Sequence, residues 1–209
     1  MAGAFRSRTK RVSRRPPTRE PKKRVLVVTE GRVTEPEYLM AFAAWKREAL
    51  VEVKISSQHG VPKTLVEIAK EQKANAEAAA RRERDDNLRF DEVWCACDVD
   101  SHPRLPDARQ MARDNGIELV VSNPCFELWL LLHYRENPGA RHRRDLQRML
   151  RREYQKDYDK HVDFDALKPG YEAAMARARR LDADADEAGE PGRNPTTGFH
   201  RLTASIAGE

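Results

Sequence analysis

Short apolar segments alternate with segments of helical periodicity along the first two thirds of the chain. Four apolar segments have the length and the β-branched content of strands and stop at polar turns: residues 24–29, 51–55, 91–98 and 117–121. Segments with apolar residues at helical spacing begin near residues 34, 62, 107 and 126. This alternation predicts an α/β fold with an open, parallel four-stranded sheet and helices on both faces.

Three of the predicted helices carry further detail. Thr34 and Glu37 fit a capping box, in which the hydroxyl and the carboxylate accept hydrogen bonds from backbone N–H groups at the start of a helix. The helix that Pro62 opens is apolar on one face in its first half, whereas its second half is Ala-rich and charged and should project into solvent. Residues 126–134 are almost wholly apolar and predict a buried helix.

The sequence changes character after residue 137. Residues 138–209 carry two further helical stripes and then an acidic stretch that contains Gly and Pro. The last segment, Asn-Pro-Thr-Thr at 194–197 followed by apolar residues at helical spacing, predicts a capped terminal helix that returns to the body. We therefore expect an α/β core over residues 24–137 and a helical annex over residues 138–209.

Positive charge is concentrated at the N-terminus. The chain of 209 residues has a formal net charge of +5, but residues 1–23 hold nine Lys or Arg and one Glu and so carry +8. The rest of the chain is therefore net negative, at −3. We expect residues 1–23 to form a disordered basic tail that is attracted to phosphate backbones without sequence preference, or else a tail that only aids solubility.

The sequence indicates neither a membrane span nor a secretory signal. No window approaches 18 consecutive apolar residues, and the N-terminus lacks the apolar stretch of a signal peptide, so we expect a cytoplasmic protein. The cysteines Cys95, Cys97 and Cys125 are then expected as thiols, and the first two have the wrong spacing for a zinc knuckle. Burial as small apolar residues explains that pair better.

Acidic residues follow two of the predicted strands at the point where each strand ends. In open parallel sheets the functional crevice lies beyond the carboxyl ends of the strands, where Glu30, Asp98 and Asp100 are placed. Their carboxylates would repel one another unless a cation or raised pKa values relieved them, and hard oxygen ligands suit Mg²⁺. Gly31 would let a substrate backbone come close. The alternative for the Asp-x-Asp is turn formation with residues 101–103.

Other polar residues border the same predicted crevice. Glu127 is the only charge between residues 124 and 133, so it either meets a partner or a metal in the site, or it stabilises the first turn of its helix. Ser122 and Asn123 end the fourth strand and either bind substrate or serve as an N-cap or in a turn. We expect His133, on the apolar helix, to be a core histidine with satisfied hydrogen bonds.

Arginine is dense in one predicted helix of the C-terminal region. These guanidinium groups lie opposite the apolar stripe of that helix, so they form either a solvated basic face or a track for a nucleic-acid backbone beside the acidic site. The residues are Arg141, Arg143, Arg144, Arg148, Arg151 and Arg152.

Four motifs resemble the RloB family. They are Val-Val-Thr-Glu-Gly at 27–31 with Thr-Glu-Pro-Glu-Tyr at 34–38, Trp-Cys-Ala-Cys-Asp-Val-Asp at 94–100, Ser-Asn-Pro-Cys-Phe-Glu-Leu-Trp at 122–129, and Asn-Pro-Thr-Thr at 194–197. The resemblance covers about residues 22–207 and implies a compact relative of the Toprim fold of topoisomerases and bacterial primases. In Toprim sites a Glu after the first strand is the general acid or base and an Asp-x-Asp after the third binds Mg²⁺. The resemblance gives these roles to Glu30, Asp98 and Asp100.

The same resemblance implies a function. It points to a Mg²⁺-dependent nuclease, with Mn²⁺ as a substitute, that hydrolyses DNA or RNA as the effector of an anti-phage, abortive-infection system beside an AAA/ABC-type ATPase. One alternative is a non-catalytic protein that binds nucleic acid or regulates the ATPase. Another is nucleotidyl transfer, against which the lack of a zinc module and of a second catalytic domain argues. Formation of a homo-oligomer is left open.

Overall fold

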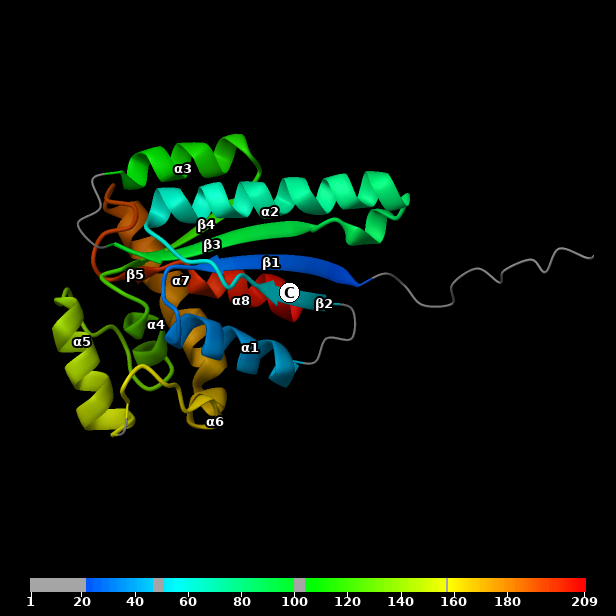
Figure 1. Cartoon of the computed structure of the whole chain (residues 1–209). Helices are drawn as coiled ribbons and strands as arrows, with labels where there is room; N and C mark the ends of the chain where they lie inside the picture. Colours follow the sequence, from blue (N-terminus) through cyan, green and yellow to red (C-terminus); the bar gives the residue numbers. More distant parts are fainter. Residues whose placement is uncertain (1–21, 47–50, 100–103, 157) are drawn as a thin grey trace, which may run out of the picture.

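The computed structural model describes residues 22–46, 51–99, 104–156 and 158–209, and it contains a five-stranded sheet (Figure 1). The strand order is β2-β1-β3-β4-β5, with β1 to β4 parallel and β5 antiparallel to β4. The strands are β1 (Lys23–Thr29), β2 (Val51–Ile55), β3 (Glu92–Asp98), β4 (Glu118–Asn123) and β5 (Thr196–Thr197).

Helices cover both faces of this sheet, as the alternating pattern predicted. Helices α2 and α3 pack on one face, whereas α1, α4, α7 and α8 pack on the other (Figure 1). The α-helices are α1 (Thr34–Lys46), α2 (Pro62–Glu83), α3 (Leu105–Asp114), α4 (Glu127–Leu132), α5 (Arg143–Met149), α6 (Phe164–Leu167), α7 (Tyr171–Glu187) and α8 (Phe199–Ala207). Three short turns of other helix types are η1 (Asp86–Leu88), η2 (Leu150–Tyr154) and η3 (Lys168–Gly170).

Strand β1, which lies between β2 and β3, is buried on both of its faces. Val25 and Val27 belong to the hydrophobic cluster on the α1 side, and Leu26 and Val28 belong to the cluster on the α2 side. Successive side chains of a strand point to opposite faces, so a strand covered on both sides needs apolar residues at every position. This is why the strand appears in the sequence as a continuous apolar run.

The cysteines are buried thiols, as the sequence predicted. Cys95, Cys97 and Cys125 are all free and buried. Cys95 and Cys97 lie in the cluster beneath α2 and α3, where burial raises the pKa of the Cys95 thiol to about 12. They fill the core as small apolar side chains.

The fifth strand corrects two expectations from the sequence. The Asn-Pro-Thr-Thr segment does not simply cap the last helix, because Thr196 and Thr197 pair with β4, and α8 begins only at Phe199. The sheet therefore has five strands rather than four. A strand of two polar residues has no apolar alternation by which its sequence could reveal it.

The C-terminal region completes the core on one face of the sheet. Apolar residues of α7 and α8 belong to the same hydrophobic cluster as those of β1 and α1. The predicted basic tail falls mainly on residues 1–21, which lie outside the described residues. None of the helices in the described ranges combines the length and the apolar character that crossing a membrane demands.

His133 is a core histidine whose two ring nitrogens are both engaged. The residue is 5% exposed. Its Nδ1 lies 2.9 Å from the carbonyl oxygen of Leu167, and its Nε2 lies 3.3 Å from the hydroxyl of Tyr38. Nδ1 therefore carries the proton and Nε2 accepts from Tyr38. Burial lowers the pKa of His133 from 6.5 to about 4.

Replacing His133 with Asn should reduce the loss of unfolding free energy that occurs as the pH falls from 6.5 to 4. The unfolded chain binds a proton near pH 6.5 and the folded protein only near pH 4, so stability is lost as the pH falls through this window. The full shift is worth on the order of 3 kcal/mol. Urea unfolding at pH 7, 5.5 and 4 measures the slope. The same change at His142, which is exposed at the start of α5, should keep the wild-type slope. Equal slopes for wild type and the His133 variant would contradict this account.

Candidate functional site

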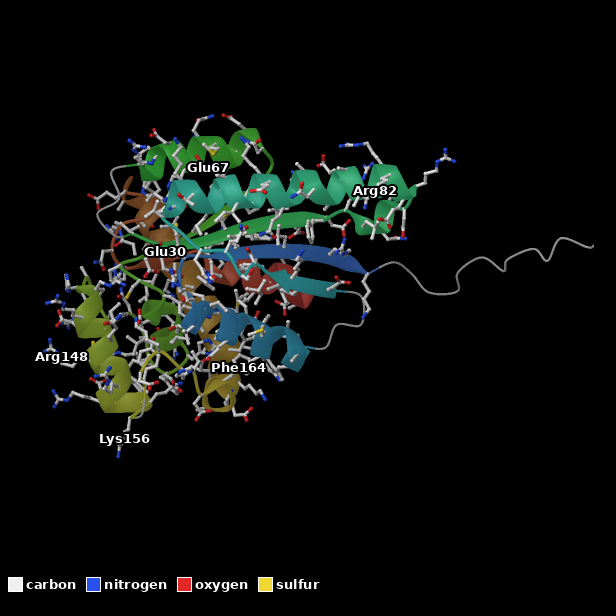
Figure 2. The ribbon with its side chains drawn as sticks, viewed as in Figure 1. Glu30, Glu67, Arg82, Arg148, Lys156 and Phe164 are labelled. Carbon is white, nitrogen blue, oxygen red and sulfur yellow. The ribbon has the colours of Figure 1, made fainter. Side chains whose placement is uncertain are left out.

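The ends of β1 and β3 bring together two of the predicted site residues. These strands are parallel neighbours with Thr29 opposite Ala96, so the residues that follow lie at the same sheet edge. The backbone N–H of Glu30 donates to the carbonyl of Ala96 at 2.9 Å. The backbone N–H of Asp98 donates to Glu30 Oε2 at 3.2 Å. Figure 2 shows Glu30 at this edge, where the strand-end argument predicted the crevice.

Asp98 connects the sheet edge to two helices. Its Oδ1 accepts a hydrogen bond of 2.9 Å from the backbone N–H of Phe126, just before α4. Its Oδ2 lies 3.7 Å from Nη2 of Arg143, at the start of α5. Burial raises the pKa of Asp98 well above its ordinary value, and the negative charges of Glu35, Glu127 and Glu30 raise it further, against the opposing effect of Arg143.

A cavity of about 320 Å³ opens at this edge and collects charged side chains from several elements. The carboxylates come from the end of β1, the start of α1, the end of β3 and the start of α4. Carboxylates among the described lining residues are Glu30, Glu35, Asp98 and Glu127, and the cations are Arg32, Arg143 and Lys160. Carboxylates therefore outnumber cations in the cavity wall. The cations could nevertheless hold an anion there.

Glu35 is a site residue that the sequence analysis did not single out. It lines the cavity, is mostly buried, and accepts a hydrogen bond of 3.2 Å from the backbone N–H of Gly31. A Cβ added to Gly31 would collide with the Glu35 carboxylate, so the glycine makes room for this acid. Burial raises the pKa of Glu35. The sequence did contain one sign of this role, because Glu35 is an acid only four residues after Gly31.

Glu127 lines the cavity and also anchors two other segments, α5 and the segment after η2. Its Oε1 accepts hydrogen bonds from Gln147 Nε2 at 2.8 Å and from the Tyr158 hydroxyl at 2.9 Å, and it lies 3.3 Å from Lys160 Nζ. Burial alone would raise the pKa of Glu127, but a hydrogen bond from Cys125 and the charge of Lys160 hold it below its ordinary value. This residue therefore meets protein partners, which was one of the two roles considered from the sequence.

The segment 159–162 is fastened to the start of α1, which corrects the predicted capping box. The hydroxyl of Thr34 donates to the carbonyl of Lys160 at 2.9 Å. The carboxylate of Glu37 accepts from His161 Nδ1 at 2.7 Å and from the backbone N–H of Val162 at 3.3 Å. The Thr34 and Glu37 side chains form hydrogen bonds with the distant segment 159–162 instead of with the backbone of their own helix. Tertiary contacts of this kind leave no pattern in the local sequence.

Ser122 and Asn123 hold the C-terminal segment and are not among the residues that line the cavity. The Ser122 hydroxyl is 2.8 Å from the hydroxyl of Thr197 across β4 and β5. Asn123 Nδ2 donates to the carbonyl of Gly192 at 2.8 Å. Both contacts are structural, but they join β4 to β5 and to Gly192 rather than forming an N-cap or a turn.

Asp100, the second predicted metal ligand, lies outside the described residues. Within the described ranges, no three His, Cys, Asp or Glu side chains are grouped so that they could hold a metal ion. The predicted Asp98 and Asp100 pair therefore stays a prediction.

The arginine-rich helix begins at the cavity and continues away from it. Arg143 lines the cavity, whereas Arg144 and Arg148 are exposed on α5, and Figure 2 shows Arg148 pointing away from the body. Arg141 and Arg151 each donate to a backbone carbonyl, at 3.0 and 2.9 Å. The exposed arginines therefore extend a basic surface outward from the acidic cavity.

Replacing Asp98 with Asn should stabilise the protein when divalent cations are removed with EDTA. Asn still accepts the hydrogen bond from Phe126 but carries no charge, so the costs of burial and repulsion disappear. A raised folded-state pKa means that wild-type stability falls as the pH rises above 3.8, so the gain should grow from pH 4 to pH 8. Urea midpoints measure it. Asp107→Asn, an exposed control on α3, should give no gain. A lower midpoint for the Asp98 variant throughout would contradict the expected repulsion.

Replacing Glu127 with Gln should destabilise the protein by about 2 kcal/mol, because three donors lose an ionised acceptor. The lowered pKa means that Glu127 contributes stability above pH 4.5, and this contribution is lost as the pH falls through the folded-state pKa. The loss in urea unfolding should therefore shrink on acidification. Glu153→Gln, which breaks an exposed pair with Arg135, should cost less than about 0.5 kcal/mol. Equal losses of unfolding free energy for the two variants would contradict the role of Glu127 in holding α5 and the segment after η2.

Comparison with known protein families gives one match that spans most of the chain. The family described as RloB-like protein matches residues 25–206, from β1 to α8. These residues include Glu30, Glu35, Asp98, Glu127 and Lys160 of the cavity. Comparisons with curated proteins and with solved structures found no match. The chain therefore belongs to the RloB-like protein family.

Proposed function

We propose that the protein is a Mg²⁺-dependent nuclease that hydrolyses phosphodiester bonds of DNA or RNA in this cavity. The observation that carries the proposal is the hydrogen bond from the backbone N–H of Asp98 to the carboxylate of Glu30. It joins two acids at the carboxyl ends of neighbouring parallel strands, beside a cavity that further carboxylates and cations line. In sheets of this kind the reactive groups lie at that edge.

The chemistry of the individual donors suits a hard divalent cation. Glu30, Glu35 and Asp98 carry carboxylate oxygens, which Mg²⁺ prefers, but no three such side chains of the described residues are grouped so that they could hold the ion by themselves. Burial and mutual repulsion raise the pKa of Asp98, and a cation would relieve that repulsion. Asp98 would hold Mg²⁺, or Mn²⁺ as a substitute, together with Asp100, which lies beyond the described residues. When bound, the cation supplies neutralisation of the charge that develops on the phosphate.

Glu30 is suited to manage the proton of the attacking or the leaving oxygen. Its carboxylate lies at the cavity and is held in place by the backbone N–H of Asp98. A carboxylate fixed within reach of a substrate can accept the proton of a water and return it to the leaving oxygen. No tyrosine is among the described residues that line the cavity, which favours hydrolysis over covalent strand transfer.

The exposed arginines of α5 and η2 would bind the nucleic-acid backbone on its way to the cavity. Arg144 and Arg148 are exposed on the outer face of α5, and Arg143 on the same helix lines the cavity. A row of guanidinium groups binds phosphates without reading the sequence. This arrangement supports a substrate that is a polymer rather than a small phosphate ester.

The resemblance to the RloB family supports a wider proposal. We propose a Toprim-like relationship and a role as the effector of an anti-phage system of the abortive-infection type, with an AAA/ABC-type ATPase as partner. These parts rest on the resemblance. The chemistry of the cavity stands on its own observations.

Cleavage assays on matched variants test the nuclease proposal. The protein is incubated with DNA and with total RNA in Mg²⁺ or Mn²⁺, with and without the ATPase. Glu30→Gln and Asp98→Asn should each lower cleavage at least about 100-fold, because one removes the proton carrier and the other a ligand for the cation. Glu67→Gln is the same change as the first on the exposed surface of α2 (Figure 2) and should leave cleavage unchanged.

Other outcomes of this assay would sink the proposal. Cleavage that persists in both site variants would remove the assignment of Glu30 and Asp98. Nucleic-acid binding without cleavage under every condition would favour a non-catalytic binding protein or a regulator of the ATPase.

A further inference from the structure

Lys160 has a backbone conformation that lysine rarely adopts. Its φ of 95° lies in the left-handed region, where a Cβ is strained and glycine is the usual residue. Among the non-glycine residues in the described ranges, Arg84 is the other with positive φ, and it closes α2 as an ordinary left-handed cap. Strained residues persist where their surroundings hold them, and they are concentrated at functional sites.

Contacts on both sides of Lys160 hold this conformation. The hydroxyl of Thr34 donates to its carbonyl at 2.9 Å, and Glu37 accepts hydrogen bonds from the two residues that follow. On the preceding side, the hydroxyl of Tyr158 donates to Glu127 at 2.9 Å. The segment is therefore fastened to α1 and to α4, and these contacts compensate the strain.

The strained backbone delivers an ammonium group to the acidic cavity. Lys160 lines the cavity, and its Nζ lies 3.3 Å from Oε1 of Glu127. The Glu127 side chain is 4% exposed, whereas that of Lys160 is 55% exposed, so the ammonium contacts a buried carboxylate and still meets solvent. Arg143 lines the same cavity, 3.7 Å from Asp98. Two cations thus reach the cavity from different segments.

The ion pair with Glu127 engages the ammonium of Lys160 without burying the lysine side chain. Tyr158 and Gln147, at 2.9 and 2.8 Å from the same carboxylate oxygen, are neutral donors, so Lys160 supplies the countercharge, yet 55% of its side chain is exposed. Glycine or asparagine would adopt this backbone conformation with less strain than Lys160. Pairing with Glu127 accounts for a cation here, and a ligand for the exposed part of the side chain would give a further reason for a lysine in this strained conformation.

We propose that Lys160 binds a non-bridging oxygen of the substrate phosphate, with Arg143 supplying a second cation. The inference rests on the proposed nuclease function and names the residue that would position the phosphate. Four carboxylates repel a phosphodiester, so cations in the cavity wall are needed to hold the anion beside the acids. An ammonium binds phosphate as a compact point charge with three donors. The substrate phosphate therefore enters the cavity itself.

Substitutions at Lys160 separate phosphate binding from folding. Lys160→Met removes the ammonium, Lys160→Arg keeps the charge, and Lys160→Gly removes the ammonium together with the strain. The probe is bis(p-nitrophenyl) phosphate, a phosphodiester too small to bridge the cavity and the outer face of α5. We expect the Met and Gly variants to lower kcat/KM about 10- to 100-fold, chiefly through KM, and the Arg variant to lose less. Lys156→Met, exposed on the same segment (Figure 2), should change nothing.

Urea unfolding and ³¹P NMR titration of inorganic phosphate with Mg²⁺ complete the test. The Gly variant should unfold at a midpoint equal to or above that of the Met variant, and both should lose the phosphate binding that wild type and Lys156→Met retain.

The outcomes distinguish this inference from the nuclease proposal. If wild type hydrolyses the probe and the Met and Gly variants do so equally well, the role of Lys160 is overturned and the nuclease proposal stands. If wild type binds phosphate through Lys160 without hydrolysing any diester, the nuclease proposal falls and the role of Lys160 stands. If wild type neither binds phosphate nor hydrolyses diesters, both are overturned.

Discussion

Repulsion among carboxylates in one small cavity is the constraint on which the rest of this structure depends. Glu30, Glu35, Asp98 and Glu127 come from four separate elements and line the same space. Burial and the neighbouring carboxylates raise the pKa values of Asp98 and Glu35 there. Backbone N–H groups and the cations Arg143 of α5 and Lys160 of the segment after η2 compensate the cost of ionising these acids.

Segments that are distant in sequence converge at this edge because they supply the donors and cations that stabilise the buried carboxylates. Backbone N–H groups at Gly31, Asp98 and Phe126 donate to the acids of the cavity. Glu127 gathers donors from α5 and from the segment that follows η2, which brings Lys160 to the cavity. The C-terminal half of the chain therefore completes the site as well as the hydrophobic core.

Much of the fold could be predicted because its signals are local. The continuous apolar run of β1 reflects a sheet that is covered on both faces. Because side chains alternate along a strand, the spacing of Cys95 and Cys97 places both of them on the face beneath α2 and α3. The β5 strand was missed because Thr196 and Thr197 form a strand of only two polar residues, which shows no apolar alternation in the sequence. The capping box at Thr34 and Glu37 was wrong because a distant segment took the same hydrogen-bonding groups.

The sequence by itself placed Glu30 and Asp98 at the same edge of the sheet, because the carboxyl ends of parallel strands share an edge, whereas their contact depends on β1 and β3 being neighbours in the structure. Only the tertiary structure decided that Glu35 turns toward Gly31 and that Lys160 reaches Glu127. The position of a residue just after a parallel strand can be predicted from the local sequence of that strand alone. Contacts between α1, α4 and the segment after η2 depend on how separate helices pack against the sheet, and no local pattern encodes that packing.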